Sequence, residues 1–552
     1  MRLKKLILLI SIVLVTIGVA GGIFFTYFGG SYTIRYQTLT SADGTQLASL
    51  VYTPKDISGT VPGVVVCHGF TSNKQAMQGI SLELVKCGFV VIAIDFRGHG
   101  QSGGNLDEDR ENLIDDVYAA VQYLKSLDYV DNNSIGLVGH SMGGQAVMRT
   151  SIAYPGEINA TVTIGMVGIN NTDYEINGTA ISNLLIAMGG LEELFTLDDA
   201  LSFLQNATGL ETVAPGILYG NFLYGNATKL FIAPHADHIL EISDTQIMNE
   251  TCTWFRASFY TGNTKAIIDN QRQLFISLAA LGSLLGFFAV IPYVKPIIYR
   301  NLPENPKKVK DPQSKKKILF HIGGYCLVNI IAFLLLIPFS YIFAGTLNLI
   351  MSNLLIGLFM GSAIGLFVIF YLIHRRVEDD PRPYLQRIKD EITHNFNRSI
   401  LFGLIIFLYS FGTLTAILQW SIFDLLPTVR EIGATIAVAF LIFPYVFFDQ
   451  LYIRNMQAYI PQGRIKELIK AVILSSIAKT ILFIPLLFIN LGFLSLVIMI
   501  LIVAFPFLEI LTTWIYMYSG RNILAPTVYA TLLLSWILVA LMPFGNYAFT
   551  LL

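Results

Sequence analysis

One short stretch of the sequence has the residue types of an acyl-transfer nucleophile. Ser141 lies in IGLVGHSMGGQAVM, residues 135 to 148. The apolar IGLV predicts a buried strand, and the small residues after the serine predict that a helix begins at once. Gly139 and Gly143 flank the turn, where a Cβ would collide with a neighbouring strand or helix. Such a turn exposes the hydroxyl and aims the helix N-terminus at a developing oxyanion. The pattern favours a catalytic serine over a purely structural turn.

An oxyanion hole needs a second donor, from the loop after an earlier strand. CHGF, residues 67 to 70, follows the apolar run VVV directly. Gly69 permits a tight turn, and the backbone N–H of Phe70 would then act together with that of Met142. The alternative is an ordinary glycine turn of an α/β protein.

A nucleophilic serine also needs a base, and the base needs an acid. In a sheet of this kind the chain order is serine, acid, histidine, each on the loop after a later strand. The apolar run KLFIAP, residues 229 to 234, precedes two histidines, His235 and His238. We favour His238 as the base, because His235 abuts the strand while His238 is far enough along the loop to fold back over the serine.

The acid is expected after the apolar run NLLIAMGG, residues 183 to 190. Glu192 is the favoured residue. Glu193 is the next choice, and Asp198 and Asp199 are more distant candidates.

The elements that position these residues follow a strand–helix alternation. Apolar runs at 63–70, 89–100 and 134–140 are separated by helical patterns at 81–88 and 111–127. Continuous Val- and Ile-rich strands between helices predict a parallel sheet covered on both faces. Active sites on such sheets lie at the carboxyl ends of the strands. This is where the candidate residues fall.

Four motifs in order, CHGF, DFRGHGQSGG, GHSMGG and ADHILE, resemble the α/β-hydrolase fold, and most closely its serine aminopeptidase and monoacylglycerol-lipase-like branch. The resemblance covers roughly residues 40 to 260. By position it implies that Ser141 is the nucleophile, His238 the base and Glu192 the acid. Phe70 and Met142 are implied as the oxyanion donors. It also implies that a segment beside the site is largely structural, at Asp95, Arg97, His99 and Ser102.

The resemblance implies a serine hydrolase of esterase, lipase or peptidase type that works without a metal or an organic cofactor. The branch usually has Asp as its acid, whereas this chain offers Glu192 after Gly189 and Gly190. Fold alone does not choose among the activities of the branch. Only about 15 residues separate the apolar runs at 160–168 and 183–190, where many relatives have a helical cap, so an open site is expected.

The rest of the chain has the composition of an integral membrane protein. Of its 552 residues, 54% are hydrophobic and only 13% are charged, against about 25% charged in a soluble domain. Residues 6–28 form a first uncharged stretch, longer than the apolar core of a cleaved signal peptide. Eight further stretches lie at 274–294, 318–343, 348–373, 400–420, 433–453, 468–489, 491–517 and 524–547. With the first stretch they make nine predicted spans, or eight if the first is a cleaved signal peptide. The predicted units are a signal anchor (1–30), a hydrolase domain (31–268) and a membrane domain of about eight helices (269–552).

Charge distribution predicts the orientation. Stretches on the N-terminal side of the membrane contain 22 Lys and Arg, whereas the short loops on the other side contain one, Arg430. By the positive-inside rule, the chain is expected to cross the cell membrane several times, with the hydrolase domain and the C-terminus on the extracytoplasmic side. Seven Asn-x-Ser/Thr sequons in that domain agree with exposure to a glycosylating compartment; they are at Asn132, Asn159, Asn170, Asn177, Asn206, Asn226 and Asn249. Segregated charge gives no support for nucleic-acid binding.

Two ionisable residues fall within apolar spans, which is costly and often functional. Lys479 and Glu509 lie on consecutive spans joined by a turn predicted near 490–492, at depths that let the side chains meet. They either pair for packing or line a path for substrate. Asp449 and Gln450 are expected at the cytoplasmic interface.

Two functional hypotheses follow. The first is a membrane-bound serine hydrolase that acts on an ester or amide, with a small-molecule, lipid or peptide substrate and membrane lipids around it. A lipid-like substrate is favoured, because membrane spans tether the domain at both ends. The alternative is a transporter or receptor whose hydrolase-like domain only binds a ligand.

Overall fold

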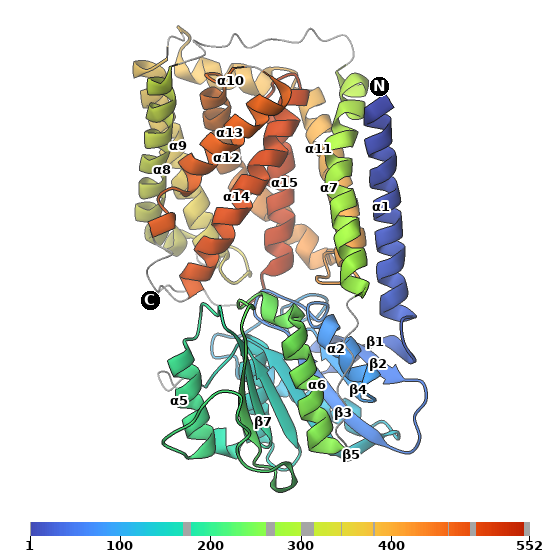
Figure 1. The fold of residues 1–552 in the computed structure, drawn as a ribbon. Coiled ribbons are helices and arrows are strands. Elements are labelled where there is room, and N and C mark those ends of the chain that lie inside the picture. Colours follow the sequence, from blue (N-terminus) through green and yellow to red (C-terminus); the bar gives the residue numbers. More distant parts are fainter. Residues whose placement is uncertain are drawn as a thin grey trace.

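The computed structural model shows an α/β domain beneath an assembly of long helices (Figure 1). The structure describes residues 2–168, 178–260, 271–299, 314–343, 345–378, 381–461, 463–485 and 493–545. The predicted sequons at Asn170 and Asn177, and the turn predicted at 490–492, lie outside these ranges.

The α/β domain is built on one eight-stranded sheet with the order β1-β2-β4-β3-β5-β6-β7-β8. The first two strands are antiparallel additions at one edge, and the other pairings are parallel. The mostly parallel sheet predicted from the sequence is therefore confirmed. The strands are β1 (Tyr32–Thr40), β2 (Gln46–Pro54), β3 (Val61–Cys67), β4 (Val90–Ile94), β5 (Val130–His140), β6 (Ala160–Ile164), β7 (Leu184–Gly189) and β8 (Thr228–Ala233).

Helices cover both faces of this sheet, so the central strands are apolar on both sides. In β3, Val64 and Val66 belong to the cluster that contains α2 and α6, while Val65 and Cys67 belong to the cluster that contains α3 and α4. Alternate side chains of a strand point to opposite faces, which explains the unbroken run of Val residues. These helices are α2 (Gln78–Lys86), α3 (Asn112–Lys125), α4 (Met142–Ala153) and α6 (Thr245–Phe259). A further helix, α5 (Leu197–Thr208), packs near β8. The domain also has the 3₁₀ turns η1 (Gly178–Ala180), η2 (Phe222–Tyr224) and η3 (Leu240–Ser243).

Within the described residues, eight helices are long and apolar enough to cross a membrane. The first is α1 (Arg2–Tyr27), which runs beside α7 and enters the α/β domain at β1 (Figure 1). The others are α7 (Gln271–Ile298), α8 (Lys315–Ile342), α9 (Ser352–Arg376), α11 (Phe396–Leu418), α12 (Val429–Gln457), α14 (Phe493–Tyr518) and α15 (Leu524–Leu541). A short amphipathic helix, α10 (Tyr384–Thr393), lies at the end away from the sheet.

The span predicted at 468–489 differs from its prediction. Here the structure has α13 (Arg464–Thr480), with 17 residues. At 1.5 Å per residue it is about 25 Å long, short of the ~30 Å hydrocarbon layer. Residues 486–489 of the predicted span lie outside the described residues.

Asp449 and Gln450, expected at the cytoplasmic interface, are both buried inside the protein, at 4% and 1% exposure. Asp449 accepts a hydrogen bond from Tyr325 of α8 at 2.7 Å, and α12 continues two turns beyond the pair. Asp449 accepts a hydrogen bond from Lys479 Nζ at 2.8 Å, and Glu509 accepts one from the same nitrogen at 2.6 Å. The predicted pairing of Lys479 and Glu509 is therefore seen, with Asp449 as a third member.

Loops at the carboxyl edge of the sheet contact the membrane helices directly. Asn73, after β3, accepts a hydrogen bond from the backbone N–H of Asp424 at 3.1 Å. After β4, the carbonyl of Gly98 accepts the N–H of Phe544 at 2.8 Å, and the carbonyl of Gly104 accepts from Arg430 at 2.7 Å. The edge of the sheet that contains the candidate residues thus faces the helical domain.

Candidate active site

Ser141 sits in a sharp turn between β5 and α4. Its backbone has φ 51° and ψ −117°, a strained conformation for a residue with a side chain. A Cβ on Gly139 would lie 2.2 Å from the carbonyl oxygen of Gly143, and a Cβ on Gly143 would lie 2.6 Å from those of Cys67 and His68. Both glycines are therefore required by close backbone approach. The turn leaves the Ser141 side chain only partly buried.

Three predicted site residues from distant parts of the chain come together here. His238 Nε2 lies 3.1 Å from Ser141 Oγ, and His238 Nδ1 lies 2.8 Å from Glu192 Oε2. The Glu192 side chain is 1% exposed, and its other oxygen accepts the N–H of Leu194 at 2.8 Å. The arrangement can move a proton from the serine to the imidazole while a carboxylate holds the opposite ring nitrogen.

The backbone of His238 is held from both sides. Its N–H donates to Glu193 Oε2 at 3.1 Å, and its carbonyl accepts a hydrogen bond from His140 Nε2 at 2.9 Å. Burial lowers the pKa of His140 to about 3, so this ring is neutral and has its proton on Nε2. Glu193, the second choice for the acid, therefore contacts the backbone of His238 while Glu192 contacts its ring.

Sequence reasoning missed a fourth side chain, Glu241, which is 0% exposed. One of its oxygens, Oε1, accepts the N–H of Gly189 at 2.5 Å. The other, Oε2, lies 3.9 Å from His238 Nδ1 and 3.5 Å from His140 Nε2. Burial, together with the nearby negative charge of Glu192, raises the pKa of Glu241 to about 10. Glu241 is therefore a neutral acid at neutral pH.

Gly165, at the end of β6, makes room for this acid. A Cβ there would lie 2.0 Å from Glu241 Oε2, and the residue has φ +57°. Glu241 also ties the histidine loop to the end of β7 through Gly189. The only sequence signal was a charged residue three positions after His238, which does not distinguish a buried acid from a surface one.

The two predicted oxyanion donors flank the serine. Met142 is the first residue of α4, so its N–H has no carbonyl one turn earlier to bond. In the described part of the chain, the N–H of Phe70 also has no acceptor. A Cβ on Gly69 would lie 3.3 Å from that of Ser141 and 2.9 Å from the His140 ring, so glycine brings this loop close to the serine.

The other candidates for the base and acid lie away from the serine. His235 is exposed. Asp198 is exposed in the first turn of α5, and Asp199 forms the capping box of that helix with Thr196. None of these three residues contacts the ring of His238.

The segment after β4 makes internal contacts that brace the loops beside the site. Asp95 accepts from Lys74 Nζ at 2.5 Å, and its backbone carbonyl accepts from Ser102 Oγ at 2.7 Å. Arg97 donates to Asp116 at 2.6 Å. His99 contacts the carbonyl of Arg97 through Nδ1 at 3.0 Å.

His140, His238 and Glu241 offer ligand-type atoms within 4.8 Å of one another, a spacing that could hold a metal ion. His140 Nε2 already donates to the carbonyl of His238, and His238 Nδ1 is engaged by Glu192. These hydrogen bonds account for the two histidine nitrogens, which we assign to the network around His238. Glu241 Oε2 has no hydrogen-bond partner among the described residues.

Comparison with known proteins agrees with this fold. Residues 61–188 match the family described as serine aminopeptidase, S33. The monoacylglycerol lipase of Mycolicibacterium smegmatis is 30% identical over 138 residues, which are 24% of this chain and 48% of the lipase. The sn-1-specific diacylglycerol lipase ABHD11 of Mus musculus is 27% identical over 144 residues, which are 26% of this chain and 44% of that protein. The chain therefore spans less than half the length of these relatives.

Among solved structures, the esterase Pf2001 of Pyrococcus furiosus aligns with 41% of this chain and 91% of its own, at 19% identity and a TM-score of 0.33. The sheet, its helices and the family match define an α/β-hydrolase, joined in one chain to long apolar helices. Its hydrolase segment is similar to the serine aminopeptidase and monoacylglycerol-lipase branch of that fold.

Proposed function

We propose that this protein is a membrane-bound serine hydrolase that cleaves an ester or amide through an acyl-enzyme. The observation behind the proposal is the pair of contacts at His238, with Ser141 Oγ at 3.1 Å from one ring nitrogen and Glu192 at 2.8 Å from the other. Both distances are within hydrogen-bond reach, the geometry that activates a serine.

The mechanism follows from these contacts. As Ser141 Oγ forms a bond to the substrate carbonyl carbon, its proton passes to His238 Nε2. The N–H groups of Phe70 and Met142 stabilise the tetrahedral oxyanion. Collapse breaks the bond to the leaving group, which takes the proton from His238. Water then attacks the acyl-enzyme by the same route, and Ser141 regains its proton. Glu192 stabilises the imidazolium throughout.

A fluorescent fluorophosphonate tests the proposal, because it labels serines that a base has activated. We expect detergent-solubilised wild type to be labelled, and Ser141→Ala and His238→Ala to lose labelling by at least 100-fold. His235→Ala is the matched control, since it removes an exposed imidazole from the same loop and should label as wild type does. Unlabelled, folded wild type would refute the proposal.

A lipid-like substrate is supported by the direction in which the site faces. The loops after β3 and β4 contact the membrane helices at Asp424, Arg430 and Phe544. The similar proteins include lipases of monoacylglycerol and diacylglycerol. We expect the full-length protein to hydrolyse long-chain monoacylglycerol faster than a soluble acetate ester. Equal rates per enzyme on both would argue against a lipid substrate.

We also propose that the hydrolase domain is extracytoplasmic. The 22 Lys and Arg of the positive-inside count, against the single Arg430, support this orientation. In the structure, α1 begins at the end of the helices away from the sheet (Figure 1). A protease added to intact cells should cut the hydrolase domain and leave a tag on the N-terminus protected. Protection of both would refute this orientation.

A further inference from the structure

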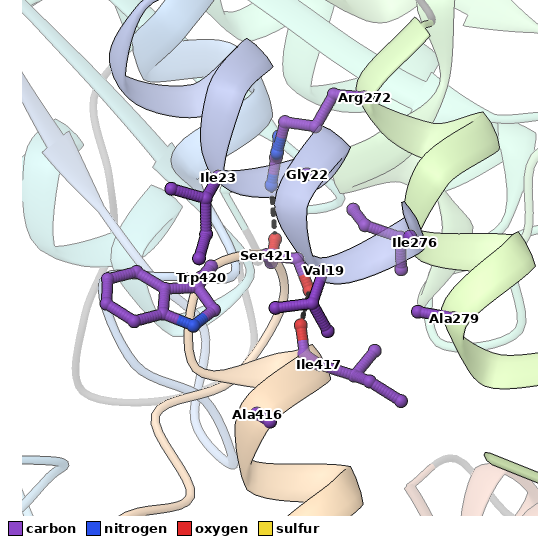
Figure 2. A pocket seen from close by; sticks show the side chains of 11 residues that line it. Val19, Gly22, Ile23, Arg272, Ile276, Ala279, Ala416, Ile417, Trp420 and Ser421 are labelled. Atoms are coloured by element: carbon purple, nitrogen blue, oxygen red, sulfur yellow. Dashed lines mark hydrogen bonds between the residues drawn. The ribbon is translucent and has the colours of Figure 1, made fainter. Parts of the chain in front are cut away.

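A groove between α1, α7 and the C-terminal end of α11 combines an apolar wall with one buried cation. The groove is shallow: its enclosed space is about that of one water molecule, and the rest opens to the surroundings. Gly22 and Ile23 of α1, Ile276 of α7, and Ile417 and Trp420 are among the residues that line it (Figure 2). We call this space the Arg272 groove, after the one charged residue in its wall.

Arg272 is the second residue of α7 and is only 7% exposed. Its guanidinium donates to the carbonyl of Ser421, which follows α11, as the dashed line in Figure 2 shows. Its Nε–H is enclosed and has no acceptor in the described part of the chain. Among the described carboxylates, Glu83 acts on Arg272 electrostatically, but none forms an ion pair with it. A buried cation without a counter-ion costs several kcal/mol. The site therefore favours an anion.

Aromatic residues of the type found at lipid headgroups lie beside the groove. Tyr27, the last residue of α1, packs edge-on against Trp420 with ring centroids 5.7 Å apart. Tyr and Trp concentrate at the membrane–water interface. Arg272 is at the same end of the helices, next to the hydrolase domain (Figure 1). The apolar part of the wall, at Ile276 and Ile417, extends from that interface toward the interior of the membrane.

We propose that the Arg272 groove binds the phosphate group of a membrane lipid. Arg272 donates charge-assisted hydrogen bonds to the phosphate, and the first methylene groups of the lipid lie along Gly22, Ile276 and Ile417. At Gly22 an added Cβ would meet no atom within 4 Å, so the groove is open at that point of α1. This binding does not depend on whether Ser141 is a nucleophile.

A lipid in this groove would join three parts of the chain. The carbonyl that Arg272 contacts belongs to Ser421, and three residues later Asp424 donates its N–H to Asn73 in the loop after β3. The occupied groove therefore stabilises the junction between the hydrolase domain and helices α1, α7 and α11. We expect the bound lipid to raise the unfolding temperature of the whole protein.

The test is lipid binding to delipidated full-length protein in a mild nonionic detergent, followed by native mass spectrometry and thermal unfolding. Phosphatidylglycerol is the probe, and diacylglycerol and inorganic phosphate are the comparison ligands. We expect one tightly retained phosphatidylglycerol per chain and a rise in unfolding temperature. Diacylglycerol lacks the phosphate and inorganic phosphate lacks the apolar part, so each should bind at least tenfold more weakly.

Two variants test the charge and the space of the groove separately. Arg272→Gln removes the charge, and Gly22→Leu fills the space while keeping the charge; each should weaken phosphatidylglycerol binding at least tenfold, and Arg272→Lys should retain part of it. The matched controls are Arg430→Gln, and Gly433→Leu, where an added Cβ also meets no atom within 4 Å. Undiminished binding in Gly22→Leu would overturn the proposal even if Arg272→Gln failed to fold. Inorganic phosphate that stabilised as strongly as the lipid would also overturn it.

Discussion

Replacing Glu241 with Gln should make the protein less sensitive to alkaline pH. In the folded protein the pKa of Glu241 is raised to about 10, chiefly by burial and then by the charge of Glu192. In the unfolded chain the same carboxyl ionises near its usual value of about 4.3. Gln keeps an oxygen that can accept the N–H of Gly189 and an amide that can face Glu192, but it has no proton to lose.

The number of protons bound in the folded and unfolded states determines how the free energy of unfolding changes with pH. Between these two pKa values the folded state keeps the Glu241 proton and the unfolded state has lost it, so the free energy of unfolding falls as the pH rises. The slope from this one group is about 1.4 kcal/mol per pH unit. The stability of wild type relative to Glu241→Gln should therefore fall by roughly 2–3 kcal/mol from pH 6 to pH 8. For a domain of this size that is a difference of about 5 °C or more in unfolding temperature.

The assay is thermal unfolding of the full-length protein in detergent, followed by tryptophan fluorescence at several pH values. Trp254 of α6 is buried in the hydrolase domain and donates to the carbonyl of Asn183, so it reports on that domain. Glu157→Gln is the matched control, because Lys125 lowers the pKa of Glu157 and its effect should stay constant above pH 6. If the curves of wild type and Glu241→Gln ran parallel from pH 6 to pH 9, Glu241 would be ionised in the fold and the reasoning would fail.

Other predictions concern backbone and charge. Gly165→Ala should destabilise the hydrolase domain by about 2–3 kcal/mol or more, because its Cβ would lie 2.0 Å from a buried carboxyl oxygen; Gly156→Ala, also at positive φ but in open space, should cost only about 1 kcal/mol, as thermal unfolding would show. Lys479→Met leaves two buried carboxylates without their shared partner and should cost about 3–5 kcal/mol. The double variant Lys479→Met/Glu509→Gln should recover part of the lost unfolding temperature, and no recovery would mean that the charges do not determine the loss.

The sheet could be predicted because its central strands are buried on both faces. A strand such as β3 needs apolar side chains at every position, and the run of Val residues shows this without knowledge of its neighbours. The turn at Ser141 was visible for a similar local reason. A Cβ on Gly139 or Gly143 would come within 2.2 to 2.6 Å of backbone oxygens. For Gly143 these are the carbonyls of Cys67 and His68, the first two residues of CHGF. Both patterns can be recognised within one short stretch of the sequence.

The surroundings of His238 could not be predicted in this way, because they are made by residues from separate loops. Glu192 was chosen by its place in the chain order, and the structure puts it 2.8 Å from the ring. Glu241 was missed because a charged residue in ADHILE is ordinarily exposed. It is buried here because Gly165 leaves space for it and Gly189 supplies a donor. Neither residue is near it in the sequence.

The contacts between the long apolar helices also could not be predicted, because they join residues that are far apart in the sequence. Position along an apolar run does not show which helices will surround a side chain. Asp449 of α12 is buried because Tyr325 of α8 and Lys479 of α13 pack against it. There Asp449 and Glu509 share Lys479, and Arg454 lies 3.3 Å from the second oxygen of Glu509. Two cations therefore meet two carboxylates. This balance gives each charge a partner, so removing one of the four side chains should destabilise the helices more than removing an opposite pair.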